Sequence, residues 1–262
     1  MKHLPNLLTL CNLLLGCIAI VFILDSQPFQ VVINGAYYYV AGTEQAYLGA
    51  VFILLAAVCD MLDGLASRAL QIFSPIGKDL DSLADLVSFG VAPAMILFKM
   101  LWASYMLAEN ALDVPMLAMA PAFLLACFAA LRLARFNVTP AARGGGFTGM
   151  PVPAAGIFVA SFPLINFYNP LGMGFLLQDK WTLYLVIALL CWLMVSRIRF
   201  FKLLPAQWKW AFIWPQAVIA LAVAVLAPFL KMAVVPVAFA LYILLSLVYR
   251  HPELSADGNG AA

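Results

Sequence analysis

Long apolar runs separated by short polar stretches dominate the pattern of hydrophobic and polar positions in this chain. A helix that spans a lipid bilayer needs about 20 mostly apolar residues, and several runs approach that length. The runs cover residues 7–24, 47–68, 83–107, 115–135, 151–168, 181–197, 211–227 and 232–249. The pattern therefore predicts an all-α fold, a polytopic integral membrane helical bundle with about eight transmembrane helices.

The composition supports this fold class. Of the 262 residues, 66% are hydrophobic and 10% are charged, whereas an ordinary soluble domain contains roughly 25% charged residues. So few charges cannot cover the surface of a water-soluble globule. The net charge of +2 gives no reason to expect nucleic acid as a partner. The 5 cysteines lie far apart in apolar runs, so neither a disulfide framework nor a zinc site is indicated.

The distribution of basic residues predicts the orientation in the membrane. With eight spans both termini lie on one side, and that side receives Lys2, Arg68, Lys78, Arg132, Arg135, Arg143, Arg197, Arg199, Lys202, Lys209 and Arg250, out of 14 Lys and Arg residues. The remainder are Lys99, Lys180 and Lys231. Because short cytoplasmic loops are enriched in Lys and Arg, we expect both termini to face the cytoplasm. We expect the chain in the inner membrane, with its functional site on the cytoplasmic side. The loop over 25–46, which has no Lys or Arg, is expected on the outer side.

Acidic residues concentrate between the second and third expected helices. The stretch holds Asp79 and two pairs, Asp60 with Asp63 and Asp81 with Asp85. The members of each pair are three or four residues apart, so each pair occupies one helix face. A short connection over 69–80 makes the two helices antiparallel neighbours. We therefore expect these four paired carboxylates to converge at the cytoplasmic boundary.

Four carboxylates so close together would repel one another unless cations bind among them. All-oxygen ligands suit Mg²⁺, Mn²⁺ or Ca²⁺, and two such ions among four aspartates are typical of phosphoryl displacement. Gly64 and Gly77 would let a phosphate approach the backbone, and the guanidinium of Arg68 suits a phosphate. The alternative is a solvated helix–loop–helix surface without a ligand.

The spacing Asp60-x2-Asp63-Gly64-x3-Arg68-x8-Gly77-x3-Asp81-x3-Asp85 resembles the signature motif of the CDP-alcohol phosphatidyltransferase family. Ser67 replaces the alanine usual before the arginine. The runs over 77–94, 131–137 and 149–155, and the opening 4–12, are similar to the branch of this family that uses serine as acceptor. The resemblance covers roughly residues 4–202.

The resemblance implies that a serine hydroxyl attacks CDP-diacylglycerol, so that phosphatidylserine forms and CMP leaves. It implies divalent cations as cofactors, Mg²⁺ or Mn²⁺ and two in number, and it suggests a homodimer in membrane lipid. The metal ligands by position are Asp60, Asp63, Asp81 and Asp85, and Asp85 is also the candidate catalytic base.

Further candidate site residues fall into two groups. Gly64, Arg68 and Ser74 match family positions that contact CDP-diacylglycerol, and Gly77 is a further candidate. Asn6, Thr9 and Asn12 recur along the start of the first helix, where they either contact the cytidine diphosphate or form interhelical hydrogen bonds.

The serine carboxylate needs its own cation in a site crowded with aspartates. Arg132 and Arg135, three residues apart, both reach one helix face, and Lys78 is a weaker candidate. Membrane anchoring explains the two arginines equally well, and Lys78 could simply be solvated.

Two classes of alternative function stay open. The aspartate motif also suits transfer to glycerol phosphate, inositol phosphate or choline. A cation transporter is less favoured, because transport sites lie near the membrane midplane in repeated halves. The expected domains are a six-helix core over 1–203, two additional transmembrane helices over 204–250, and a disordered tail over 251–262.

Overall fold

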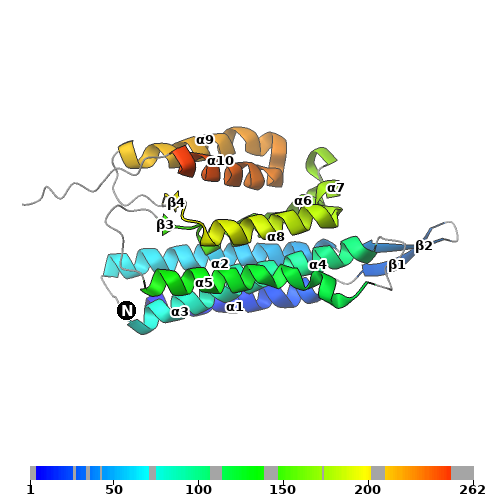
Figure 1. The fold of residues 1–262 in the computed structure, drawn as a ribbon, viewed down its shortest axis with the longest axis horizontal. Helices are drawn as coiled ribbons and strands as arrows, with labels where there is room; N and C mark the ends of the chain where they lie inside the picture. The colour runs from blue at the N-terminus through cyan, green and yellow to red at the C-terminus, as the bar shows by residue number, and fades with distance from the viewer. Residues whose placement is uncertain are drawn as a thin grey trace, which may run out of the picture.

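The computed structural model describes residues 4–25, 28–33, 36–41, 43–70, 75–106, 114–138, 147–172, 174–201 and 210–248. Nearly all of these residues are helical, which confirms the all-α part of the prediction. The long helices lie alongside one another in an elongated bundle (Figure 1). The helices are α1 (Leu4–Asp25), α2 (Thr43–Leu70), α3 (Pro75–Asp85), α4 (Ala92–Met106), α5 (Leu124–Val138), α6 (Val152–Tyr168), α7 (Gly174–Gln178), α8 (Lys180–Val195), α9 (Trp210–Leu230) and α10 (Val234–Val248).

Among the described residues, five helical segments are long and apolar enough to cross a membrane: Leu4–Asp25, Gln45–Leu70, Ile76–Met106, Met116–Val138 and Trp214–Val248. The last segment contains both α9 and α10, which lie side by side with a short turn between them (Figure 1). Two shorter apolar helices, α6 and α8, complete the bundle. The chain is therefore an integral membrane protein, and its apolar helices occupy the predicted runs.

Successive long helices alternate in direction, so that α1 begins and α10 ends at the same end of the bundle (Figure 1). The two small sheets lie at opposite ends. Strands β1 (Pro28–Ile33) and β2 (Ala36–Ala41) form an antiparallel hairpin where an outer loop was predicted. Strands β3 (Phe147–Thr148) and β4 (Arg199–Phe200) pair at the end where α1 begins. The number of passes through a membrane and their orientation stay predictions.

The third helix begins earlier than the sequence pattern predicted. It starts at Pro75 rather than near residue 83, and it runs through α3 and a π-helical turn over Leu86–Val91 into α4. Proline suits the first turn of a helix because its missing N–H would have no partner there. Gly77 consequently lies inside the first turn of α3, not before the helix. Because α3 contains several charged side chains, the pattern of apolar residues did not predict this helix.

The π-helical turn is packed between α1 and α6 through small residues. A Cβ on Gly16 of α1 would clash with Ser88 Oγ, and one on Gly156 of α6 would lie 2.8 Å from Phe89 Cβ. Ser88 and Phe89 are fully buried. The missing side chains therefore allow both helices to approach the turn that directly follows Asp85.

The last two helices attach to the bundle through α10, which packs on α6 and β4. Phe239 of α10 stacks on Phe158 of α6 with ring centroids 4.1 Å apart. Tyr242 Oη donates a hydrogen bond of 3.1 Å to the carbonyl of Phe201. The predicted boundary at residue 203 and the predicted tail lie outside the described residues.

Candidate functional site

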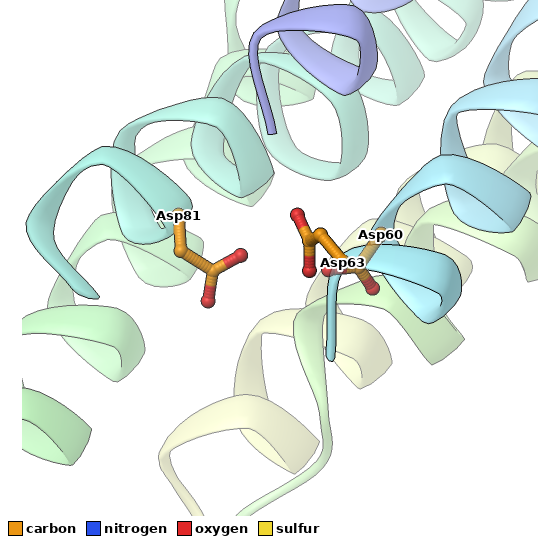
Figure 2. Close-up of side chains that lie close together, drawn as sticks. All are labelled: Asp60, Asp63 and Asp81. Atoms are coloured by element: carbon orange, nitrogen blue, oxygen red, sulfur yellow. The ribbon is translucent and has the colours of Figure 1, made fainter. Parts of the chain in front are cut away.

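The carboxylates of Asp60, Asp63 and Asp81 converge at the contact between α2 and α3. Asp60 and Asp63 come from the last turns of α2 and Asp81 from the middle of α3, and their side chains point toward one another (Figure 2). One carboxylate oxygen from each residue lies within 4.8 Å of the other two. The helical spacing and the antiparallel arrangement of α2 and α3 together produce this acidic cluster.

The fourth predicted aspartate lies beside the acidic cluster. Asp85 ends α3, is 7% exposed, and its side chain lies close to that of Asp60. Its oxygens are not part of the close group that Asp60, Asp63 and Asp81 form. Asp85 is therefore as buried as Asp63 and lies next to the acidic cluster rather than within it.

Helix α1 places two buried polar side chains against the acidic cluster and Asp85. Thr9 Oγ1 donates a hydrogen bond of 2.8 Å to Asp63 Oδ2, and Asn12 Nδ2 donates one of 3.4 Å to Asp85 Oδ1. Thr9 is 4% exposed and Asn12 is fully buried. Both residues thus form interhelical hydrogen bonds, and their contact with the cytidine diphosphate stays a prediction. Asn6, three residues before Thr9, is half-buried.

The acidic cluster fits a hard divalent cation. All of its donors are carboxylate oxygens, which Mg²⁺ and Mn²⁺ prefer. Among the described residues, Asp81 Oδ1 is buried and has no hydrogen-bond partner. A buried polar atom without a partner costs free energy, and a bound cation would remove that cost as well as the repulsion among the carboxylates.

The backbone beside the acidic cluster is open at Gly64. No described atom lies within 4 Å of the position that a Cβ on Gly64 would occupy. Ser67 Oγ donates to the Gly64 carbonyl at 3.2 Å, and Arg68 is exposed in the last turn of α2. A ligand can therefore approach this face of α2 closely. Ser74, the other predicted contact in this region, lies outside the described residues.

Exposed apolar side chains surround the same turns of α2. Met61 and Leu62 are each 43% exposed, and Leu65 is 45% exposed. They alternate along the helix with Asp60, Asp63 and Gly64. In a bundle that spans a membrane, such a surface faces lipid, so an apolar face of α2 lies beside Gly64 and is turned away from Asp60 and Asp63.

Of the three predicted serine-binding residues, Arg132 is the one that is buried and interacts with an aspartate. It is 8% exposed on α5, and its guanidinium interacts electrostatically with Asp85. The guanidinium carbon also lies 5.4 Å from the ring centroid of Phe136. Arg135, one turn further along α5, is exposed. The structure therefore separates two arginines that sequence spacing treated alike.

Lys78, the third predicted serine-binding residue, joins α3 to the end of α5. Its Nζ donates a hydrogen bond of 2.9 Å to the carbonyl of Asn137. Asn137 Nδ2 in turn donates one of 2.8 Å to Ser82 Oγ. A lysine at a helix C-terminus stabilises the last carbonyl groups, so this contact gives Lys78 a structural role.

Comparison with known proteins decides the family. The profile described as CDP-alcohol phosphatidyltransferase matches residues 2–246. The chain belongs to the CDP-alcohol phosphatidyltransferase family. The match runs through α9 and most of α10, beyond the region that the motif resemblance reached. Divalent cations are used throughout this family, which agrees with the oxygen ligands of the acidic cluster.

Several relatives are similar to this CDP-alcohol phosphatidyltransferase. Archaetidylserine synthase from Methanothermobacter thermautotrophicus is 32% identical over 179 residues, which cover 66% of this chain and 63% of that protein. CDP-diacylglycerol–serine O-phosphatidyltransferase from Helicobacter pylori strain J99 is 31% identical over 208 residues, covering 78% of this chain and 74% of the relative. The enzyme with the same name from Bacillus subtilis strain 168 is 30% identical over 188 residues, covering 69% and 89%.

Proposed function

We propose that this CDP-alcohol phosphatidyltransferase transfers the phosphatidyl group of CDP-diacylglycerol to the hydroxyl of L-serine. The products are phosphatidylserine and CMP. Relatives that are named for this activity align with most of the chain. The observation that carries the proposal is the convergence of Asp60, Asp63 and Asp81 beside the open backbone of Gly64.

In this proposal the acidic cluster holds two divalent cations, Mg²⁺ or Mn²⁺, through Asp60, Asp63 and Asp81, with Asp85 as a further ligand or the base. Cations bound there neutralise charge on the pyrophosphate and on the departing CMP. Asp85 accepts the proton of the serine hydroxyl as its oxygen bonds to phosphorus. The bond between that phosphorus and the CMP oxygen breaks, and CMP leaves with the bonding pair.

The lipid substrate is proposed to lie along α2. Gly64 and Gly77 let the diphosphate approach the backbone, and Arg68, with its exposed guanidinium, binds a phosphate oxygen. The exposed Met61, Leu62 and Leu65 lie where the acyl chains would remain in lipid. Thr9 acts on this site through Asp63, to which it is hydrogen-bonded, and Asn6 remains a candidate contact to the cytidine diphosphate.

The serine carboxylate is proposed to bind Arg132. Its burial and its interaction with Asp85 support this choice over Arg135 and Lys78. A buried arginine beside the base would hold serine by its carboxylate while the hydroxyl faces Asp85. Glycerol phosphate, inositol phosphate and choline have no carboxylate for that contact.

The membrane arrangement completes the proposal. We place both termini and the acidic cluster at the cytoplasmic face of the inner membrane, with eight transmembrane passes and a homodimeric assembly. The basic residues of α2, α3, α5 and β4 lie at the end where α1 begins, which supports this orientation. A transporter is not favoured, because the carboxylates lie near one end of the bundle rather than at its midplane.

The test is an acceptor panel with purified protein. CDP-diacylglycerol in mixed micelles, Mn²⁺ or Mg²⁺, and each candidate alcohol are combined, and CMP release is measured. We expect release with L-serine and little with glycerol phosphate, inositol phosphate or choline. Release with another alcohol and not with serine would refute the proposed acceptor, and no release with any alcohol would refute the transferase.

A further inference from the structure

Asn12 is a fully buried amide in the middle of an apolar helix. Burial of an amide costs free energy unless its donors and acceptors are paired. Nδ2 of Asn12 donates to Asp85 Oδ1 at 3.4 Å, and among the described residues Asn12 Oδ1 has no hydrogen-bond partner. An apolar residue at this position would avoid the unpaired oxygen, so packing alone does not explain the asparagine.

The orientation of the amide follows from its neighbour. A carboxylate oxygen accepts hydrogen bonds, so it pairs with the amide nitrogen, and the opposite orientation would place two oxygens against each other. Nδ2 of Asn12 therefore faces Asp85. This contact occupies Oδ1 of Asp85 and leaves the other carboxylate oxygen, Oδ2, for further interactions.

A second contact fixes Asn12 relative to Asp85. Ser88 Oγ, in the π-helical turn after Asp85, donates a hydrogen bond of 3.0 Å to the backbone carbonyl of Asn12. The absence of a side chain at Gly16 allows this approach, since a Cβ there would lie 2.9 Å from Ser88 Cα. The two hydrogen bonds of Asn12 thus join α1 to Asp85 and to the π-helical turn that follows it.

We propose that Asn12 is a positioning residue for the reaction, acting through Asp85. By holding Oδ1, it sets the rotation of the carboxyl group and directs Oδ2 toward Asp60 and the reacting groups. This inference rests on the proposed role of Asp85 in the transfer. It assigns to α1 a function in the chemistry that is separate from binding of the nucleotide.

The test compares Asn12→Leu, which keeps a similar volume without the amide, with Ser161→Ala. Ser161 is a buried residue of α6 whose hydroxyl donates to the carbonyl of Phe158, so its variant loses one side-chain hydrogen bond away from the acidic cluster. We expect Asn12→Leu to lower kcat roughly tenfold or more, with KM for both substrates within about twofold of wild type. Thermal stability and Mn²⁺ affinity should stay near wild type, and Ser161→Ala should retain its kcat.

A second variant guards against a folding defect. Asn12→Gln keeps the amide on a longer side chain, and we expect it to recover part of the lost kcat. Equal kcat for Asn12→Leu and wild type would overturn the inference. A loss of kcat with a parallel loss of stability or Mn²⁺ affinity would also overturn it, because Asn12 would then be structural. The assay uses whichever alcohol supports wild-type turnover, so failure of the serine assignment is detected separately.

Discussion

Thr9 and Asp63 are joined across the contact between α1 and α2 by a hydrogen bond of 2.8 Å from Thr9 Oγ1 to Asp63 Oδ2. The same hydroxyl lies 3.0 Å from the carbonyl of Pro5 in the preceding turn of α1, which restricts the rotation of the Thr9 side chain. This contact uses Oδ2 of Asp63 and fixes the orientation of its carboxylate within the acidic cluster. The acidic cluster is therefore oriented by a helix that contributes no carboxylate to it.

Loss of one carboxylate from the acidic cluster should abolish activity without loss of the fold. Asp60→Asn and Asp81→Asn keep the shape of the side chain but remove an anionic ligand. We expect kcat to fall by roughly a hundredfold or more, because cation binding is the main source of charge stabilisation. CMP release and thermal melting measure the two effects. Asp79→Asn, at an exposed position of α3, is the control and should remain active.

Removal of divalent cations should stop turnover reversibly. EDTA treatment should leave no measurable CMP release, and addition of Mg²⁺ or Mn²⁺ should restore it. The chelated protein should also melt at a lower temperature, since the cations no longer screen the repulsion among Asp60, Asp63 and Asp81. Undiminished turnover after exhaustive chelation would show that the acidic cluster does not work through a metal.

Gly64→Ala should weaken binding of CDP-diacylglycerol without lowering the stability of the fold. Nothing described lies within 4 Å of the new methyl group, so the melting temperature should not fall, and the higher helix propensity of alanine should raise it slightly. The methyl group would occupy the face proposed for the diphosphate, and we expect KM for CDP-diacylglycerol to rise by roughly tenfold. The contrasting variant is Gly156→Ala, whose Cβ would meet Phe89 Cβ at 2.8 Å and should lower stability. Normal KM in Gly64→Ala would place the diphosphate elsewhere.

Arg132→Gln should raise KM for serine far more than KM for CDP-diacylglycerol. A hydrogen bond to a charged group contributes roughly 1.5–3 kcal/mol, which corresponds to about tenfold or more in KM. Arg135→Gln and Lys78→Gln are the matched comparisons and should change KM for serine much less. If Arg132→Gln keeps the wild-type KM, the carboxylate is bound by another group.

Cysteine labelling should report the orientation of the bundle. In a background without native cysteines, Val32→Cys places an exposed thiol on β1, and Arg197→Cys places one after α8 at the opposite end. An impermeant thiol reagent added to intact cells should label Val32→Cys and leave Arg197→Cys unmodified. The reverse pattern would place the acidic cluster outside the cytoplasm.

The apolar runs and the acidic pairs were predictable because each follows from one helical period. The runs located the apolar helices, and the three- and four-residue spacings of Asp60 with Asp63 and Asp81 with Asp85 predicted one acidic site. The start of the third helix was wrong because α3 is polar, and hydropathy does not detect a polar helix. The β1–β2 hairpin was missed because a lack of charge in 25–46 indicates a side of the membrane but no backbone conformation.

Interactions between helices distant in sequence needed the structure. The spacing of Arg132 and Arg135 could not reveal that one is buried near Asp85 and the other exposed. The positions of Thr9 and Asn12 suggested either nucleotide contact or interhelical bonding. The structure contains the interhelical hydrogen bonds, and nucleotide contact stays a prediction. Nothing in the pattern indicated the π-helical turn, since its register depends on the close contacts of Gly16 and Gly156.

The exposed side chains of Met61, Leu62 and Leu65 imply that the lipid substrate reaches the site within the plane of the membrane. A lipid that reaches Gly64 along that apolar face of α2 arrives by lateral diffusion and never enters the aqueous phase. Turnover should then follow the mole fraction of CDP-diacylglycerol in the bilayer or micelle, and inert detergent added at constant bulk concentration of substrate should slow it by surface dilution. Serine, which arrives from water, should retain an ordinary dependence on bulk concentration.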